Sequence, residues 1–165
     1  PLYSSAASDV YKRQSLRVLA VAWALAAAAA WAAGPDVNTD ADGLALHGYD
    51  PVAYFTAGQA AKGSPQFQAT YRGAVYHFRS AANRERFRAD PGRYAPQYGG
   101  FCAMGAAMGR ELDVDPHVWH IEDGRLYLNV NADIQKKWLS DVPGHLRKAD
   151  RNWAEIRHRP PSALQ

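Results

Sequence analysis

Two turn dipeptides constrain the fold of this chain more than any other feature, because each one separates two apolar runs. Arg72-Gly73 divides the segment 67–79, and Asp123-Gly124 divides the segment 118–128. An Asp-Gly step with apolar residues on both sides is one of the strongest short-range signals for a β-hairpin. The sequence therefore predicts two antiparallel hairpins.

Each predicted hairpin is followed by a signal for a helix. Ser80 caps a helix over residues 81–90, which ends at Asp90-Pro91 because the residue before a proline disfavours helical backbone. Asn131 caps the next helix, and a final helix runs from about Gly144. This order, without a parallel crossover, predicts a small single α+β domain of two β-hairpins each followed by helices, ending in a C-terminal helix. The sequence itself shows no internal repeat strong enough to indicate a duplication.

The composition indicates one globular domain. The chain has 165 residues, of which 47% are hydrophobic and 12% are aromatic, so a core of ordinary size can form. The single cysteine, Cys102, excludes an internal disulfide framework and a zinc site built from several cysteines of one chain. No catalytic carboxylate pair, Ser-His-Asp order, phosphate loop or dinucleotide fingerprint is recognisable, which favours a protein that is not an enzyme.

The N-terminal residues indicate export. Residues 1–14 include the string SSAASDVYKRQ, which resembles a translated sequencing adapter, and we interpret them as an artefact. Residues 15–32 have one cation, an uncharged stretch and small residues at its end, which is the layout of a signal peptide. The apolar run is shorter than a membrane-spanning helix requires, so we expect cleavage without stable membrane insertion. The expected location is periplasmic or secreted, by the bacterial general secretion route.

The charge distribution argues against a nucleic-acid partner. The net charge of the chain is +3, and removal of the signal peptide and the residues before it brings the remainder close to neutrality. A nucleic-acid-binding protein needs a basic face that neutralises phosphates. We expect a flexible, Asp-rich lead-in at residues 33–45, a folded domain at residues 46–157 and a tail at residues 158–165.

Four motifs together resemble one known family. They are GYDPVAYF at 48–55, YHF at 76–78, NRERF at 83–87 and PGRYAPQYGGFCA at 91–103. The chain resembles exported, stand-alone YHS-domain proteins, and the resemblance extends from about Leu46 to Trp153. It implies a binding module that handles a soft transition metal, with copper favoured.

The metal site of that family is not simply transferred to this chain. The better-known YHS pattern has a cysteine after Asp-Pro-Val and a second one between Phe and Ser, and these positions hold Ala53 and Arg79 here. Neither side chain is a soft-metal ligand. The candidate metal ligands that remain are Cys102 with His77 and His47.

Cys102 can be read as functional or as structural. If a helix begins after Gly99-Gly100, its dipole would lower the pKa of the thiol, and a thiolate is both a nucleophile and a soft-metal ligand. This allows copper handling with an imidazole or, alternatively, a thiol redox protein. In a third interpretation Cys102 is buried, and the protein is a structural or interaction module that binds another envelope protein. Met104 and Met108 would lie on the other side of such a helix, and we interpret both as core residues.

Overall fold

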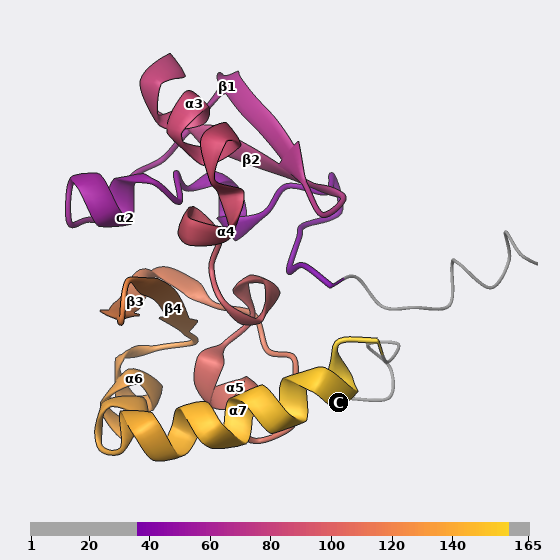
Figure 1. The fold of residues 1–165 in the computed structure, drawn as a ribbon, viewed down its shortest axis with the longest axis vertical. Coiled ribbons are helices and arrows are strands. Elements are labelled where there is room, and N and C mark those ends of the chain that lie inside the picture. The colour runs from indigo at the N-terminus through magenta and orange to yellow at the C-terminus, as the bar shows by residue number, and fades with distance from the viewer. Residues whose placement is uncertain (1–35, 159–165) are drawn as a thin grey trace, which may run out of the picture. The chain divides into compact units, whose positions relative to one another are not determined.

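The computed structural model describes residues 36–158. Its elements in chain order are η1 (Leu46–Gly48), α2 (Ala53–Thr56), β1 (Ser64–Tyr71), β2 (Ala74–Phe78), α3 (Ala81–Ala89), α4 (Pro91–Tyr94), η2 (Tyr98–Gly100), α5 (Ala103–Ala107), β3 (Asp115–Glu122), β4 (Arg125–Asn129), α6 (Ala132–Leu139) and α7 (Val142–Ile156) (Figure 1). The predicted α+β class with a C-terminal helix is confirmed. The interpretations of residues 1–14 and 15–32 and of the tail beyond residue 158 lie outside the described residues.

Both hairpins turn at the predicted dipeptides. β1 pairs with β2 and β3 pairs with β4, each antiparallel. The two central turn residues have φ of 49° and 79° at Arg72-Gly73, and of 48° and 70° at Asp123-Gly124. Two consecutive left-handed residues are typical of the type I′ turn, whose twist matches that of the strands it joins. A glycine at the second central position, between two apolar runs, is therefore the local signal that the two hairpins share.

The helices after the hairpins begin at the predicted caps. The Ser80 Oγ accepts a hydrogen bond from the Asn83 N–H at the start of α3, and the Asn131 Oδ1 accepts one from the Ile134 N–H at the start of α6. These bonds satisfy N–H groups that have no partner within the helix. The final helix, α7, begins at Val142, slightly earlier than the sequence predicts.

The described part of the lead-in, residues 36–45, is packed against the rest of the fold. Val37 and Ala45 are buried in the core, and the Asn38 N–H donates a hydrogen bond of 2.8 Å to the Gly99 carbonyl. The expectation of a flexible segment is therefore corrected over residues 36–45. Acidic residues alternate along this segment, so its sequence is typical of a polar linker although Val37 and Ala45 anchor it in the core.

The described chain repeats one order of elements twice. Each half has a turn of 3-10 helix, a short helix, a hairpin and two further helices. The strands have eight and five residues in both hairpins, and the register shifts at the same place, between Ser64 and Gln68 and between Asp115 and Trp119. We call residues 45–94 the first copy and residues 97–156 the second copy. The structure thus contains an internal repeat that the sequence does not reveal.

The backbone conformation of η1 and η2 supports this equivalence. All three residues have positive φ in both turns, between 51° and 75° in η1 and between 53° and 85° in η2. Such a run is rare, because left-handed backbone costs energy for residues other than glycine. The residue before each turn also donates to the same strand position, Ala45 to the Val75 carbonyl at 2.8 Å and Gln97 to the Leu126 carbonyl at 2.9 Å.

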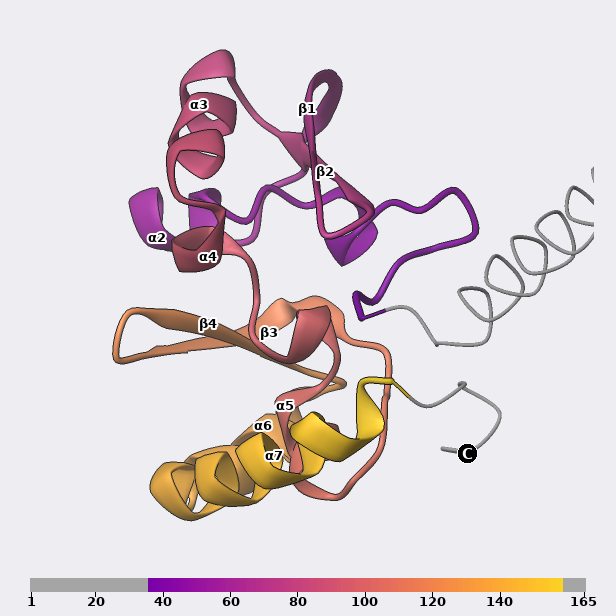
Figure 2. The same ribbon diagram turned by 45° about the vertical axis from the view of Figure 1, so that its right-hand side comes forward.

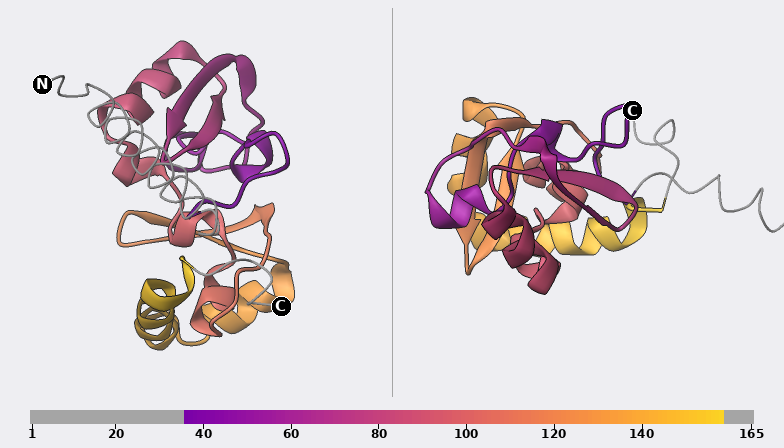
Figure 3. Two further views of the ribbon diagram at one scale, coloured as in Figure 1. Left: turned by 90° about the vertical axis from the view of Figure 1, so that its right-hand side faces the viewer. Right: turned by 90° about the horizontal axis from the view of Figure 1, so that it is seen from above.

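Each copy packs an aromatic residue of the helix after its hairpin on that hairpin. In the first copy Phe87 of α3 contacts Tyr76 and Phe78 of β2, with ring centroids 4.9 and 5.1 Å apart. In the second copy Trp138 of α6 contacts Tyr127 of β4 at 5.7 Å. Figures 2 and 3 show α3 beside the β1–β2 hairpin and α6 with α7 beside the β3–β4 hairpin.

The two copies share part of their cores. The Tyr54 hydroxyl of α2 donates to the Pro116 carbonyl of β3 at 2.9 Å, and the Tyr54 ring lies 5.3 Å from that of Trp119. Leu46 of η1 also belongs to the second copy's core cluster. Between residues 36 and 158, none of the helices combines the length and apolar character needed to cross a bilayer.

Candidate functional site

Cys102 is completely buried and precedes α5 as its N-cap residue. Its Sγ accepts a hydrogen bond from the Gly105 N–H at 3.3 Å, and its thiol donates to the Asn129 Oδ1 at 3.5 Å. Both hydrogen-bonding roles of the thiol are therefore taken by the protein itself.

The repeat assigns Cys102 a structural counterpart, Asp50. Each residue follows its 3-10 turn at the same distance, and each backbone N–H donates to a loop carbonyl, that of Ala61 for Asp50 and that of Leu112 for Cys102. Both side chains are 0% exposed. Each accepts an N–H of the helical turn that follows it, and the donor to the Asp50 Oδ1 is Val52. Cys102 therefore lies where the turn needs a buried acceptor for a backbone N–H, and this structural role accounts for its position.

His47 is paired with a carboxylate at the surface. Its Nε2 lies 2.8 Å from the Asp113 Oδ1, which also accepts hydrogen bonds from Asn38 and Val114. Burial opposes ionisation, but the hydrogen bonds from Asn38, Val114 and His47 hold the pKa of Asp113 below its ordinary value. Asp113 is thus a fixed negative charge beside this imidazole.

His77 lies in β2 between the buried Tyr76 and Phe78, and its Nδ1 faces Gly48 of η1. Its side chain is on the face of the hairpin opposite to its two aromatic neighbours, as the alternation along the strand predicts. Within the described residues, the Cys102 side chain forms hydrogen bonds with Asn129 and Gly105 and none with His77.

A further histidine contact, which the sequence analysis missed, lies on the same side as His47. The Tyr49 hydroxyl is 3.0 Å from the His117 Nε2, and the two rings meet edge to face. The Lys62 ammonium lies 4.5 Å from the Tyr49 ring centroid and donates to the His47 carbonyl at 2.7 Å. Tyr49, His117, Lys62 and the His47 carbonyl therefore serve as interaction partners for one another.

The candidate metal ligands are not gathered into a three-residue cluster. Among residues 36–158, no three side chains of His, Cys, Asp or Glu lie close enough to hold a metal ion. Cys102, His47 and His77 therefore do not form a three-ligand site. Met104 is buried as expected, but Met108 is 57% exposed because α5 ends before it, so its prediction as a core residue is wrong.

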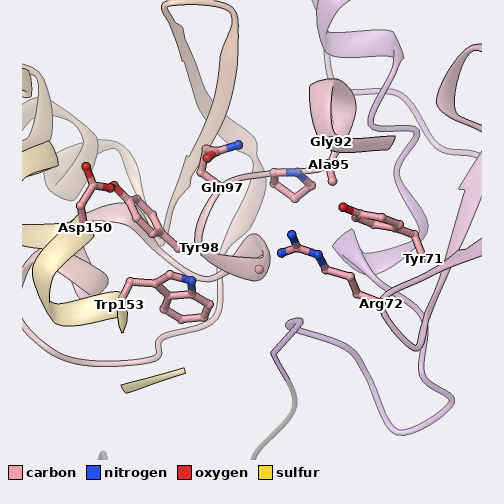
Figure 4. A pocket seen from close by; sticks show the side chains of 10 residues that line it. Tyr71, Arg72, Gly92, Ala95, Gln97, Tyr98, Asp150 and Trp153 are labelled. Atoms are coloured by element: carbon pink, nitrogen blue, oxygen red, sulfur yellow. The ribbon is translucent and has the colours of Figure 1, made fainter. Parts of the chain in front are cut away.

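A hollow of about 250 Å³ lies where segments of both copies meet (Figure 4). The first hairpin contributes Tyr71 and Arg72 to its lining. Tyr98 comes from η2 and Gln97 directly precedes it, and α7 contributes Asp150 and Trp153. These residues are remote in sequence, so no single motif points to them.

The wall of the hollow on the second copy is held by fixed contacts. The Tyr98 hydroxyl donates to the Asp150 Oδ1 at 2.9 Å. Burial, followed by this hydrogen bond, raises the pKa of Tyr98, so the hydroxyl remains a donor at neutral pH. The Trp153 ring lies 6.0 Å from the rings of both Tyr98 and Phe101.

Arg72 supplies the positive charge of the opposite wall. Figure 4 shows its guanidinium directed into the hollow, and the guanidinium carbon lies 5.3 Å from the centroid of the Tyr71 ring. No carboxylate of the described chain forms an ion pair with it. From the sequence, Arg72 is expected only to be a turn residue. The available signal was an arginine at a position where a type I′ turn favours Asn, Asp or Gly.

The comparisons with known proteins concern the first copy. Residues 52–98 match the family model of the YHS domain, and this span ends at η2, where the second copy begins. Neither a curated protein nor a solved structure gives a significant match to the chain.

Proposed function

Because the chain contains a YHS domain at residues 52–98, we propose that it is an exported, non-enzymatic binding module that holds a small ligand in the hollow beside Arg72. The observation that supports this most strongly is that both copies contribute polar groups to the hollow that the fold does not use. Within residues 36–158, the Arg72 guanidinium contacts the Tyr71 ring but forms no hydrogen bond, and the Gln97 carboxamide forms none either. Convergent polar groups in a concave site are what a small-molecule site requires.

Copper handling through Cys102 is the alternative that the family resemblance implies. It requires a thiol that a metal ion can reach and an imidazole close to it. The burial of Cys102 and its hydrogen bonds with Gly105 and Asn129 support a structural thiol instead. The same burial weighs against a thiol redox protein, because reactive cysteines are partly exposed.

The interaction-module alternative shares this structural thiol and differs in its partner. It expects another envelope protein, rather than a small molecule, to bind the chain. Its test is whether Cys102→Ser alters stability and leaves partner binding unchanged.

The indole N–H of Trp153 can report on the hollow directly. We would record ¹H–¹⁵N NMR spectra of the purified chain with benzoate, benzamide, inorganic phosphate, putrescine and glucose in turn, and assign the Trp153 signal with Trp153→Phe. At least one compound should shift this signal in a saturable way. Trp119 and Trp138, which are packed elsewhere, serve as internal controls. If no compound moves the Trp153 signal selectively, the proposed binding site is wrong.

A separate titration tests copper. Anaerobic Cu(I), in competition with a chelator, should bind the wild-type chain and the Cys102→Ser variant equally. Tighter binding by the wild type would make the sulfur a ligand and replace our proposal with the copper alternative.

Export is proposed from the layout of residues 15–32. Expression in a bacterial host followed by fractionation should recover the protein from the periplasm, cleaved near Ala32. Recovery of only uncleaved protein in the cytoplasm would contradict this part of the proposal.

A further inference from the structure

We infer that the hollow beside Arg72 is a carboxylate site, which takes a small aromatic acid with its carboxylate on Arg72 and its ring beside Trp153. This inference rests on the proposed function, because it names the ligand class of the same site. It follows from the backbone of Arg72, the charges around it and the rings that line the hollow.

The backbone of Arg72 is the first observation. Its φ of 49° is left-handed, at the first central position of a turn that favours Asn, Asp or Gly. The second copy has such a residue at the equivalent place, Asp123, with φ of 48°. Residues held in costly conformations concentrate at functional sites. The requirements of the turn do not explain an arginine here, whereas a role for its side chain in the hollow does.

The charges near Arg72 are the second observation. Two carboxylates line the hollows to which Arg72 belongs, that of Asp150 in this hollow and that of Asp36 in a neighbouring one. The first accepts the hydroxyl of Tyr98, and the second lies 3.4 Å from the Nδ1 of His158. Figure 4 shows Asp150 beside Tyr98 at one side of the hollow, with Arg72 directed in from the other side. The guanidinium is therefore left to pair with an external anion.

The donor set favours a carboxylate over a phosphate. One guanidinium carries one charge and offers two parallel N–H groups, which match the two oxygens of a carboxylate. The Gln97 carboxamide lines the same hollow and can donate a further hydrogen bond. A phosphate group carries about 1.5 to 2 negative charges at neutral pH, and no second cation lines this hollow among the described residues.

The rings around the hollow favour an aromatic ligand. Trp153, Tyr98 and Tyr71 all contribute to its lining, and aromatic rings pair by offset or edge-to-face contact. The volume of about 250 Å³ restricts the ligand to a small molecule.

The test compares benzoate with benzamide, which has the same ring and no charge. Benzoate should shift the Trp153 indole signal, and benzamide should bind about tenfold more weakly because it lacks the charge-assisted pair. Arg72→Gln should reduce benzoate affinity by about tenfold and leave benzamide unchanged. Arg79→Gln is the matched control, because Arg79 is an exposed arginine of the same copy outside the hollow. Benzoate affinity should also fall as NaCl is added. Thermal unfolding of both variants checks that they are folded.

The outcomes separate this inference from the proposed function. If benzamide binds as well as benzoate, or if Arg72→Gln has no effect, the carboxylate inference is overturned while the binding site stands. Tighter binding of inorganic phosphate than of benzoate would also overturn it. If no compound of the larger panel moves the Trp153 signal, the site itself is wrong.

Discussion

Cys102 occupies in the second copy the position that Asp50 occupies in the first, and both side chains close the same turn from within the core. Asp50 accepts hydrogen bonds from the N–H groups of Val52 and Arg79 and from the Asn83 carboxamide. A thiol makes fewer and weaker hydrogen bonds than a carboxylate, but its burial requires no counter-charge. The same structural requirement is thus met by two different side chains.

Replacing Cys102 tests this structural role. Cys102→Ala should destabilise the protein by about 1 kcal/mol more than Cys102→Ser, because alanine leaves the Gly105 N–H without its cap. Urea denaturation of the three proteins measures the difference. Iodoacetamide should modify the wild-type thiol only as the protein unfolds. Modification of the native protein at the rate of free cysteine would contradict the structural role.

Replacing Gly99 tests the close approach between the lead-in and η2. Gly99 has φ of +62°, and a Cβ at this position would clash with the Asp36 carbonyl oxygen. Gly73 has φ of +79° and open space around it, so Gly73→Ala isolates the backbone cost, about 1 kcal/mol. Gly99→Ala should cost about 1–3 kcal/mol more. Equal losses in urea denaturation would mean that the close approach does not constrain the fold.

Replacing Arg72 tests whether the first hairpin is strained. Arg72→Asn places a residue that the type I′ turn favours, so the free energy of unfolding should rise by about 0.5–1 kcal/mol. Asp123→Asn in the equivalent turn should change stability by only a few tenths of a kcal/mol, because Asp already suits that position. The stabilised Arg72→Asn variant should at the same time lose its preference for benzoate. A lower free energy of unfolding in Arg72→Asn would show that the left-handed backbone of Arg72 does not destabilise this turn.

Glu111 predicts a pH dependence of stability. Burial, and then the negative charge of Asp36, raise the pKa of Glu111 to about 7, above its unfolded value of about 4.3. Between these two values the folded state binds more protons than the unfolded state, so stability falls as the pH rises from about 4 to about 7. Glu111→Gln should remove this part of the slope in urea titrations at several pH values. Glu85→Gln, which alters an exposed glutamate on α3, should keep it, and an unchanged slope in Glu111→Gln would contradict the assignment.

The hairpins and the starts of their helices could be predicted because their signals are local. A turn dipeptide such as Asp123-Gly124 sets backbone conformation, and a cap such as Ser80 or Asn131 satisfies N–H groups within one helical turn. The repeat could not be predicted in this way. It is carried by backbone conformation, and the sequences that adopt it differ, Leu-His-Gly in η1 and Tyr-Gly-Gly in η2.

The chemistry of Cys102 and His47 makes them candidate ligands, but their surroundings depend on distant segments of the chain. Asn129 accepts the thiol of Cys102, and Asp113 binds the imidazole of His47. Neither partner is near in sequence, so periodicity gives no sign of it. The hollow beside Arg72 was missed for the same reason, because three separate parts of the chain form it.

The reach of Tyr54 into the second copy has a consequence for the dependence of one copy on the other. A protein with only the first copy would leave this side chain and that of Leu46 open to water. Because both copies belong to one polypeptide, these side chains stay covered at any protein concentration.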